Sequence, residues 1–246
     1  MGYISMIASL LPIALILILK LYKNRSLVFL MLNYLSTLLY NVMKENLIDL
    51  PPAYVKGFGV TTNLLDVPLT LFFLLYFTKS PNFRKKLHIT ILSFAVFEIL
   101  TTIFFGFTKD TITIIMGPGM LILIVLSFTF FIDQIKAVIQ FGKPSGKALM
   151  SASTLFLYGC FFIIYLFWYV FKTTNEKDRD AAFLVYFFVV TFASLLMSIG
   201  LLMEKKRFKA LDEIITARKE LSMLYPNEKL LFPKETAGSF EEDDQY

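Results

Sequence analysis

Two acidic residues, Asp66 and Glu98, each lie near the middle of a long apolar run. A polar side chain inside a lipid bilayer is costly and normally faces a protein interior or a wet cavity. If the two carboxyl groups meet at similar depth, repulsion and desolvation keep at least one of them protonated near neutral pH. Such a pair is the basis of a proton relay or a proton-coupled site. The alternative is two protonated acids that hydrogen-bond to neighbouring Ser, Thr, Tyr or Asn.

Uncharged polar side chains accompany these acids at helical spacing. Asn33, Tyr40 and Asn41, together with Ser36 and Thr37, fall on one continuous helical face. The resulting candidates for ligand binding or proton relay are Asp66, Glu98, Asn33, Tyr40, Asn41, Asn63, Tyr158 and Tyr165. Together they predict a polar pocket in the middle of a helix bundle. The alternative is that Asn side chains hydrogen-bond between helices and that Ser and Thr promote close packing.

Other chemistry has little support in the sequence. The chain contains one His and one Cys, His88 and Cys160, which removes most zinc and triad chemistry. We identify no catalytic residue, no metal site and no cofactor site. The segment 142–147 superficially resembles a phosphate-binding loop but lacks the spacing of that motif.

The composition requires these polar residues to be positioned by membrane-spanning elements. Hydrophobic residues make up 57 % of the 246 residues and aromatic residues 16 %, whereas charged residues are only 17 %. Mean hydropathy is +0.66. A soluble fold of this length still exposes many residues to water, so it cannot bury that much apolar surface. The composition therefore excludes a soluble enzyme, a disordered chain and a secreted disulfide scaffold.

Seven apolar runs predict an all-α, polytopic membrane protein with a bundle of seven transmembrane helices. A helix needs about 20 mostly apolar residues to cross a bilayer core of about 30 Å. The runs cover residues 3–22, 27–43, 57–78, 89–107, 112–135, 149–171 and 181–203. They are continuously apolar, whereas the strands of a membrane barrel alternate over about 10 residues.

The loops between these runs differ in charge. Every second loop is richer in Lys and Arg, which the positive-inside rule assigns to the cytoplasm. These residues are Lys20, Lys23, Arg25, Lys79, Arg84, Lys85, Lys86, Lys136, Lys143, Lys147, Lys205, Lys206, Arg207 and Lys209. We therefore expect a multi-pass protein of the inner (cytoplasmic) membrane, with its N-terminus outside and its C-terminus inside. The scatter of these charges over four loops argues against nucleic-acid binding.

The helices and the tail carry further signals. Pro12, Pro68 and the sequence Gly117-Pro118-Gly119 predict interruptions in three of the helices. Residues 1–203 form the predicted transmembrane domain, 204–226 a cytoplasmic juxtamembrane helix and 227–246 a disordered acidic tail. The juxtamembrane helix lies on anionic lipid, pairs with a cytoplasmic partner or a second copy, or continues the seventh helix into solvent.

Some of these patterns resemble known families. The seven-run, N-outside pattern resembles rhodopsin-like proteins, and residues 63–70, with Asp66 and Pro68, are similar to a helix of microbial rhodopsins. That family binds retinal through a Schiff-base lysine in its seventh helix, and run 181–203 contains no Lys. Seven runs with Pro12 and Pro118 also resemble carriers of the PQ-loop type, without their Pro-Gln motif. The chain further resembles uncharacterised bacterial seven-helix membrane proteins, which implies no function.

Three functions remain open at this point. The first is a membrane sensor or ligand-binding protein whose mid-membrane pocket holds a small amphipathic ligand and whose C-terminal helix contacts a partner. The second is a small secondary transporter that uses Asp66 and Glu98 as proton carriers. The third is a membrane enzyme that modifies lipid with two acids as general acid and base, which lacks an activated nucleophile or metal motif.

Overall fold

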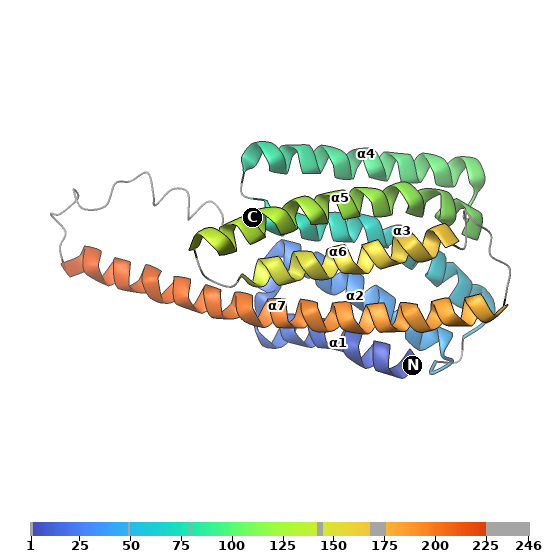
Figure 1. Cartoon of the computed structure of the whole chain (residues 1–246), viewed down its shortest axis with the longest axis horizontal. Helices are drawn as coiled ribbons and strands as arrows, with labels where there is room; N and C mark the ends of the chain where they lie inside the picture. Colours follow the sequence, from blue (N-terminus) through green and yellow to red (C-terminus); the bar gives the residue numbers. More distant parts are fainter. Residues whose placement is uncertain (1, 49, 79, 142–144, 168–175, 225–246) are drawn as a thin grey trace.

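The computed structural model describes residues 2–48, 50–78, 80–141, 145–167 and 176–224, and within these ranges its regular elements are helices. Successive α-helices run in opposite directions and pack side by side (Figure 1). The elements are α1 (Gly2–Ile18), η1 (Leu21–Lys23), α2 (Arg25–Lys44), α3 (Pro52–Leu74), η2 (Leu75–Phe77), α4 (Pro81–Phe105), α5 (Lys109–Phe141), α6 (Gly146–Tyr165) and α7 (Glu176–Leu224). The all-α prediction is confirmed.

Six of these helices are long and apolar enough to cross a membrane. They cover Arg25–Lys44, Pro52–Phe77, Pro81–Phe105, Asp110–Gln140, Gly146–Tyr165 and Leu184–Arg207. The apolar part of α1, Tyr3–Ile18, is shorter. The predicted run 3–22 is interrupted because Lys20 adopts a left-handed backbone conformation (φ 56°), after which the chain continues in the 3₁₀ helix η1.

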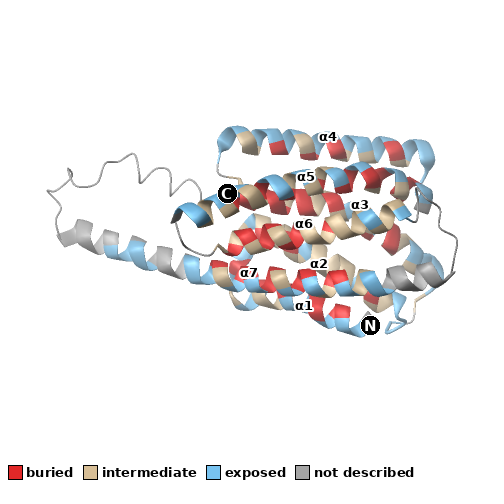
Figure 2. Cartoon of the chain, viewed as in Figure 1, coloured by how far each residue is buried: buried red, intermediate tan, exposed pale blue. Residues whose placement is uncertain are grey.

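Six of the seven α-helices form a closed ring, and the remaining helix, α4, lies outside it. Around the ring, α1 packs on α2, α2 on α3, α3 on α5, α5 on α6, α6 on α7, and α7 on α1. Helix α4 packs chiefly against α5 and α3, from outside (Figure 1). Its outer surface is apolar and exposed, with Leu92, Ile103 and Phe104 among its exposed side chains. Buried residues are concentrated where the ring helices face one another (Figure 2).

One end of the ring is filled by close-packed apolar side chains. Phe77 contacts Phe73 and Phe130 edge-on or tilted, with ring centroids 5.3 and 5.6 Å apart. Met150 and Leu201 are fully buried in the same core. This packing closes the ring at the end where α3 meets α4 and where α7 extends past the other helices.

The predicted interruptions at proline are absent, since α1, α3 and α5 continue past Pro12, Pro68 and Pro118. Proline has no N–H to donate within the helix and crowds the preceding turn. Close to Pro118, the hydroxyl of Tyr165 on α6 donates to the carbonyl of Thr113 on α5 at 3.0 Å. The carbonyl for which Pro118 provides no N–H is that of Ile114, so this bond attaches α6 to α5 and does not replace the missing one.

Helix α7 shows no boundary at residue 203. It continues as one α-helix to Leu224, so residues 204–224 of the predicted juxtamembrane helix extend the last span directly. Described residues beyond Arg207, such as Glu213 and Ile214, are exposed (Figure 2). The predicted acidic tail, 227–246, lies outside the described residues.

A close helix crossing in the ring, between α6 and α7, depends on glycine. A Cβ at Gly146 of α6 would collide with the backbone carbonyl of Gly200 on α7 and lie 2.9 Å from the backbone nitrogen of Glu204. Backbone atoms cannot rotate away from such a contact. The two helices therefore cross this closely only with glycine at position 146.

We expect Gly146→Ala to destabilise the bundle by about 1–3 kcal/mol, because the added methyl group overpacks the crossing. The measurement is the thermal midpoint of the purified chain by far-UV circular dichroism. Gly159→Ala in the same helix is the matched control, since nothing lies within 4 Å of its Cβ position. Equal midpoints for the two variants would contradict the proposed role of this crossing.

Candidate functional site

The ring of six helices surrounds a cavity of about 780 Å³. This volume falls within the range of about 300–1,000 Å³ that is typical of small-molecule sites. At one end the cavity is lined by Glu45, Asn46 and Leu50 from the connection between α2 and α3, and along α3 it reaches Phe73. Most of its wall comes from α2, α3, α6 and α7, with smaller contributions from α1 and α5 and none from α4. The cavity therefore extends from one end of the bundle into its interior.

Four polar side chains on three helices form a hydrogen-bonded ring in the wall of this cavity. Asn33 of α2 donates through Nδ2 to Asp66 Oδ1 at 2.9 Å and to Thr70 Oγ1 at 2.7 Å. Tyr158 of α6 donates to the same Asp66 oxygen at 2.8 Å. The Tyr158 and Thr70 hydroxyl groups are 2.7 Å apart. This polar ring connects α2, α3 and α6 at the depth of Asp66.

The hydrogen count fixes the direction of each bond in this polar ring. The single hydroxyl proton of Tyr158 goes to Asp66, so the Thr70 hydroxyl must donate to Tyr158. Asn33 then uses both amide protons, one on Thr70 and one on Asp66. Every donor of the polar ring is therefore used, and the final acceptor is Oδ1 of Asp66.

The second carboxyl oxygen of Asp66 remains available to the cavity. Oδ2 accepts no hydrogen bond from the described residues, and it is not among their fully buried, unpartnered atoms. Asp66 itself is half-buried and lines the cavity. Oδ2 is therefore the carboxyl oxygen without a partner among the described residues, while the bonds on Oδ1 hold the group in place.

Further polar atoms near the cavity lack partners. Asn41 Nδ2 and Thr62 Oγ1 are buried without a hydrogen-bond partner among the described residues, and both residues line the cavity. A buried, unsatisfied polar group costs about 1–3 kcal/mol. Such groups are characteristic of a site that also binds a polar molecule.

All of the predicted site residues except Glu98 line this cavity. The lining includes Asn33, Tyr40, Asn41, Asn63, Asp66, Tyr158 and Tyr165. Asn63 donates to the carbonyl of Gly59 at 2.7 Å, and a Cβ at Gly59 would lie 2.6 Å from the Tyr40 ring. Gly59 thus allows the Tyr40 ring to lie flat against α3. The hydroxyl group of Tyr165 donates a hydrogen bond to the carbonyl of Thr113.

Glu98 is separated from the cavity, so the structure does not bring the two predicted carboxyl groups together there. The reason is that α4 lies outside the ring of helices. Between them, Gly119 of α5 packs against both Val67 and Phe94, since a Cβ there would lie 2.8 and 2.9 Å from these side chains. Glu98 Oε1 is buried without a hydrogen-bond partner among the described residues.

Sequence reasoning missed two tyrosines of the site, Tyr34 and Tyr186, both of which line the cavity. Tyr34 immediately follows Asn33, outside the regular spacing of the polar face. Tyr186 precedes Val190 and Ser194 at intervals of four, which is the spacing of one helical face. That periodicity was a usable signal, obscured by the aromatic residues around it in the sequence.

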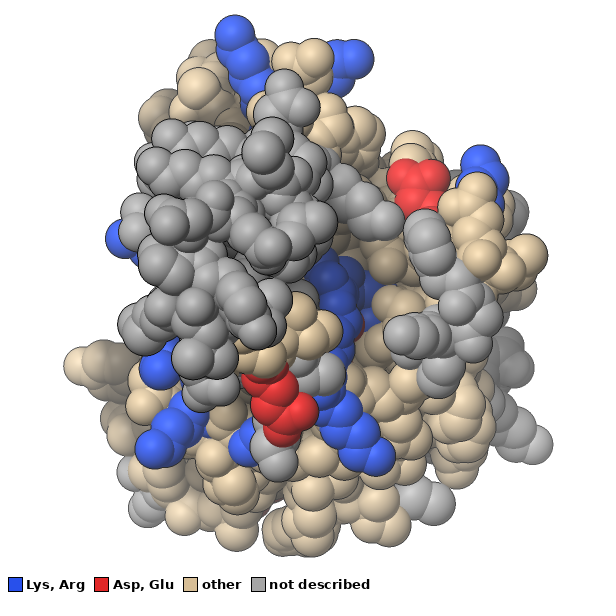
Figure 3. Space-filling view, turned by 90° about the vertical axis from the view of Figure 1, so that its left-hand side faces the viewer, with Lys and Arg blue, Asp and Glu red and all other residues tan. Residues whose placement is uncertain are grey.

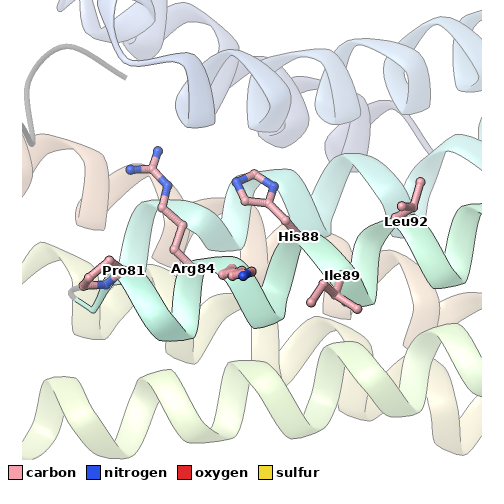
Figure 4. Close-up of a pocket in the computed structure, with 6 residues that line it drawn as sticks. Pro81, Arg84, His88, Ile89 and Leu92 are labelled. Atoms are coloured by element: carbon pink, nitrogen blue, oxygen red, sulfur yellow. The ribbon is translucent and has the colours of Figure 1, made fainter.

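A second, shallow depression lies on α4. Its six lining residues, which include Pro81, Arg84, His88 and Ile89, all come from this one helix. Arg84 and His88, one helical turn apart, point to the same side (Figure 4). A single helix provides only one wall, so this depression lacks the enclosure of the cavity. Among the described residues, no group of three or more His, Cys, Asp or Glu is placed to bind a metal ion.

A second polar cluster lies at the closed end of the bundle. The Tyr76 hydroxyl donates to Oε2 of the fully buried Glu204 at 2.7 Å, and Arg207 is 3.4 Å from the other carboxyl oxygen. Lys147 donates to the Tyr76 carbonyl at 3.2 Å and lies 4.3 Å from the centre of its ring. Through Tyr76, these contacts attach η2 to both α6 and α7, near the point where α7 extends past the other helices. Lys and Arg side chains surround this end (Figure 3).

Comparisons with protein-family models, with curated proteins and with solved structures found no match to this chain.

We expect Tyr158→Phe to lower the free energy of unfolding in detergent micelles by about 1–3 kcal/mol, because Thr70 and Asp66 each lose a partner. Adding Thr70→Val to this variant also takes an acceptor from Asn33, but the further loss should be smaller than the cost of Thr70→Val alone, because the bond between Thr70 and Tyr158 is already absent. Tyr54→Phe is the control, since Tyr54 is 70 % exposed. Strictly additive effects of the two substitutions in chemical denaturation would show that the polar ring does not act as a unit.

Proposed function

We propose that this chain is an integral protein of the cytoplasmic membrane that binds a small amphipathic ligand in the cavity between its helices. In this proposal all seven helices cross the bilayer, with the N-terminus outside and the C-terminus in the cytoplasm. The distribution of charge supports this orientation. Lys and Arg side chains lie around the closed end of the bundle (Figure 3), and Glu45 and Asn46 line the cavity at its other end.

The observation that carries the proposal is the combination of the cavity with the polar ring. An enclosed space lined by apolar side chains and a few oriented polar groups is the usual form of a small-molecule site. Here the apolar wall includes Leu157, Ile164 and Val190, and the oriented group is Asp66. The ligand that fits such a wall has both an apolar body and a polar group.

The arrangement of α7 supports a sensor. Tyr186, Val190 and Ser194 line the cavity, and the same helix continues without interruption to Leu224. A ligand that repositions the cavity side of α7 thereby repositions its extension on the cytoplasmic side. The extension would present this change to a cytoplasmic partner or to a second copy of the chain.

A proton-coupled transporter is the second candidate, favoured by the titratable group that Asp66 places in the cavity. It requires a path through the apolar core around Phe77, Phe130 and Leu201. Glu98 lies outside the cavity and so does not provide a second proton carrier there. Flux of a bound compound into liposomes, driven by a pH gradient, would favour this candidate over the sensor.

Accessibility of the cavity from outside the cell tests the proposed function. In a Cys160→Ser background, we expect Thr37→Cys, which lies in the cavity wall, to react with MTSET, a membrane-impermeant cationic thiol reagent, added to intact cells. Ile99→Cys on the exposed apolar face of α4 is the control. Its thiol would lie among acyl chains, where thiolate formation is suppressed, so its rate should be lower by about tenfold or more.

Equal rates at the two positions would contradict an accessible cavity. Reaction of Thr37→Cys only in inverted membrane vesicles would contradict the proposed orientation. Either outcome removes the proposed function.

A further inference from the structure

The cavity contains an acid without a base at the same depth. Lys44 and Lys56 are the basic residues among the lining residues, and both lie toward the connection between α2 and α3. Lys56 precedes Asp66 by ten residues on α3, which corresponds to about 15 Å along the helix axis. The polar ring gives Asp66 two neutral donors, Asn33 and Tyr158. A carboxylate in an apolar interior is greatly stabilised by a nearby positive charge, and among the described lining residues none lies at the depth of Asp66.

Aromatic rings surround the approach to this acid. Tyr34, Tyr40, Tyr158, Phe161 and Tyr186 line the cavity. Phe161 stacks on Tyr186 with 5.2 Å between ring centroids and meets Tyr158 edge-on at 6.4 Å. Ammonium groups bind favourably over the faces of such rings, more strongly when water is excluded. The aromatic rings and the carboxyl group of Asp66 therefore both favour a positively charged ligand.

From this arrangement we propose that the ligand is an organic cation, a protonated amine with an apolar body, whose ammonium group binds Oδ2 of Asp66. This inference rests on the proposed function and specifies the ligand class of the same cavity. Oδ1 is already occupied by Asn33 and Tyr158, so the ammonium group meets an oxygen whose position is fixed. The apolar body lies along Leu157, Ile164 and Val190. An anionic ligand at this depth would be repelled by Asp66.

The test compares three compounds that each carry a phenyl ring on a four-carbon chain: 4-phenylbutylamine, 4-phenylbutanol and 4-phenylbutyrate. Binding to the full chain in lipid nanodiscs at pH 7 is measured by isothermal titration calorimetry, with empty nanodiscs as the blank. We expect the amine to bind at least about tenfold more tightly than the alcohol, and the butyrate most weakly. Asp66→Asn should remove the preference for the amine over the alcohol. Glu98→Gln, which neutralises an acid outside the cavity, should retain the preference.

A second measurement keeps Asp66 intact, in case Asp66→Asn does not fold. In the Thr37→Cys chain with Cys160→Ser, the amine should slow modification by MTSES, an anionic thiol reagent, at concentrations where the alcohol has no effect. Equal binding or equal protection by amine and alcohol would overturn the amine proposal and leave the ligand-binding function in place. Failure of all three compounds to bind a chain whose Thr37→Cys is accessible would also overturn it. An inaccessible Thr37→Cys would instead remove the proposed function itself.

Discussion

A carboxyl group inside an apolar bundle must be hydrogen-bonded, and the way Asp66 meets this requirement organises the interior of this protein. Its partners come from α2 and α6, so satisfying one acid fixes the relative positions of three helices. Thr70 completes the arrangement by accepting from Asn33 while its hydroxyl group lies 2.7 Å from that of Tyr158. Helix association in a membrane gains little from the hydrophobic effect, which makes such contacts between helices important. The same network leaves one carboxyl oxygen facing the cavity.

The cavity follows from the arrangement of the helices around this acid. Six helices in a closed ring leave more space at the centre than a bundle of four, and side chains of ordinary size fill that space only at one end. At the filled end, Phe73, Phe77 and Phe130 pack together. The cavity is lined both by small polar residues such as Thr37, Ser153 and Ser194 and by aromatic residues such as Tyr186. The two ends therefore differ in whether their side chains meet at the centre.

The sequence predicted the helices well because continuous apolar runs specify them locally. It also placed Asn33, Asp66 and Tyr158 among the site residues, since a polar residue in an apolar run has few alternatives to an interior position. It failed for Glu98 because periodicity identifies the inward face of a helix and not which helices form the ring. It also failed at Pro12, Pro68 and Pro118, since α1, α3 and α5 continue past these residues. The error at Glu98 concerns contacts between helices, which local patterns do not encode.

The close crossing of α6 and α7 at Gly146 and Gly200 has a mechanical consequence for α7. Helix α7 would tilt about this crossing, since the two backbones are in contact there and α7 is continuous on both sides of it. Tyr186 lies about 21 Å to one side of Gly200 and Leu224 about 36 Å to the other, at 1.5 Å per residue. A rigid helix that tilts about this point moves its two ends in opposite directions. A displacement of about 1 Å at Tyr186 would therefore produce a displacement of about 1.7 Å at Leu224, in the opposite direction.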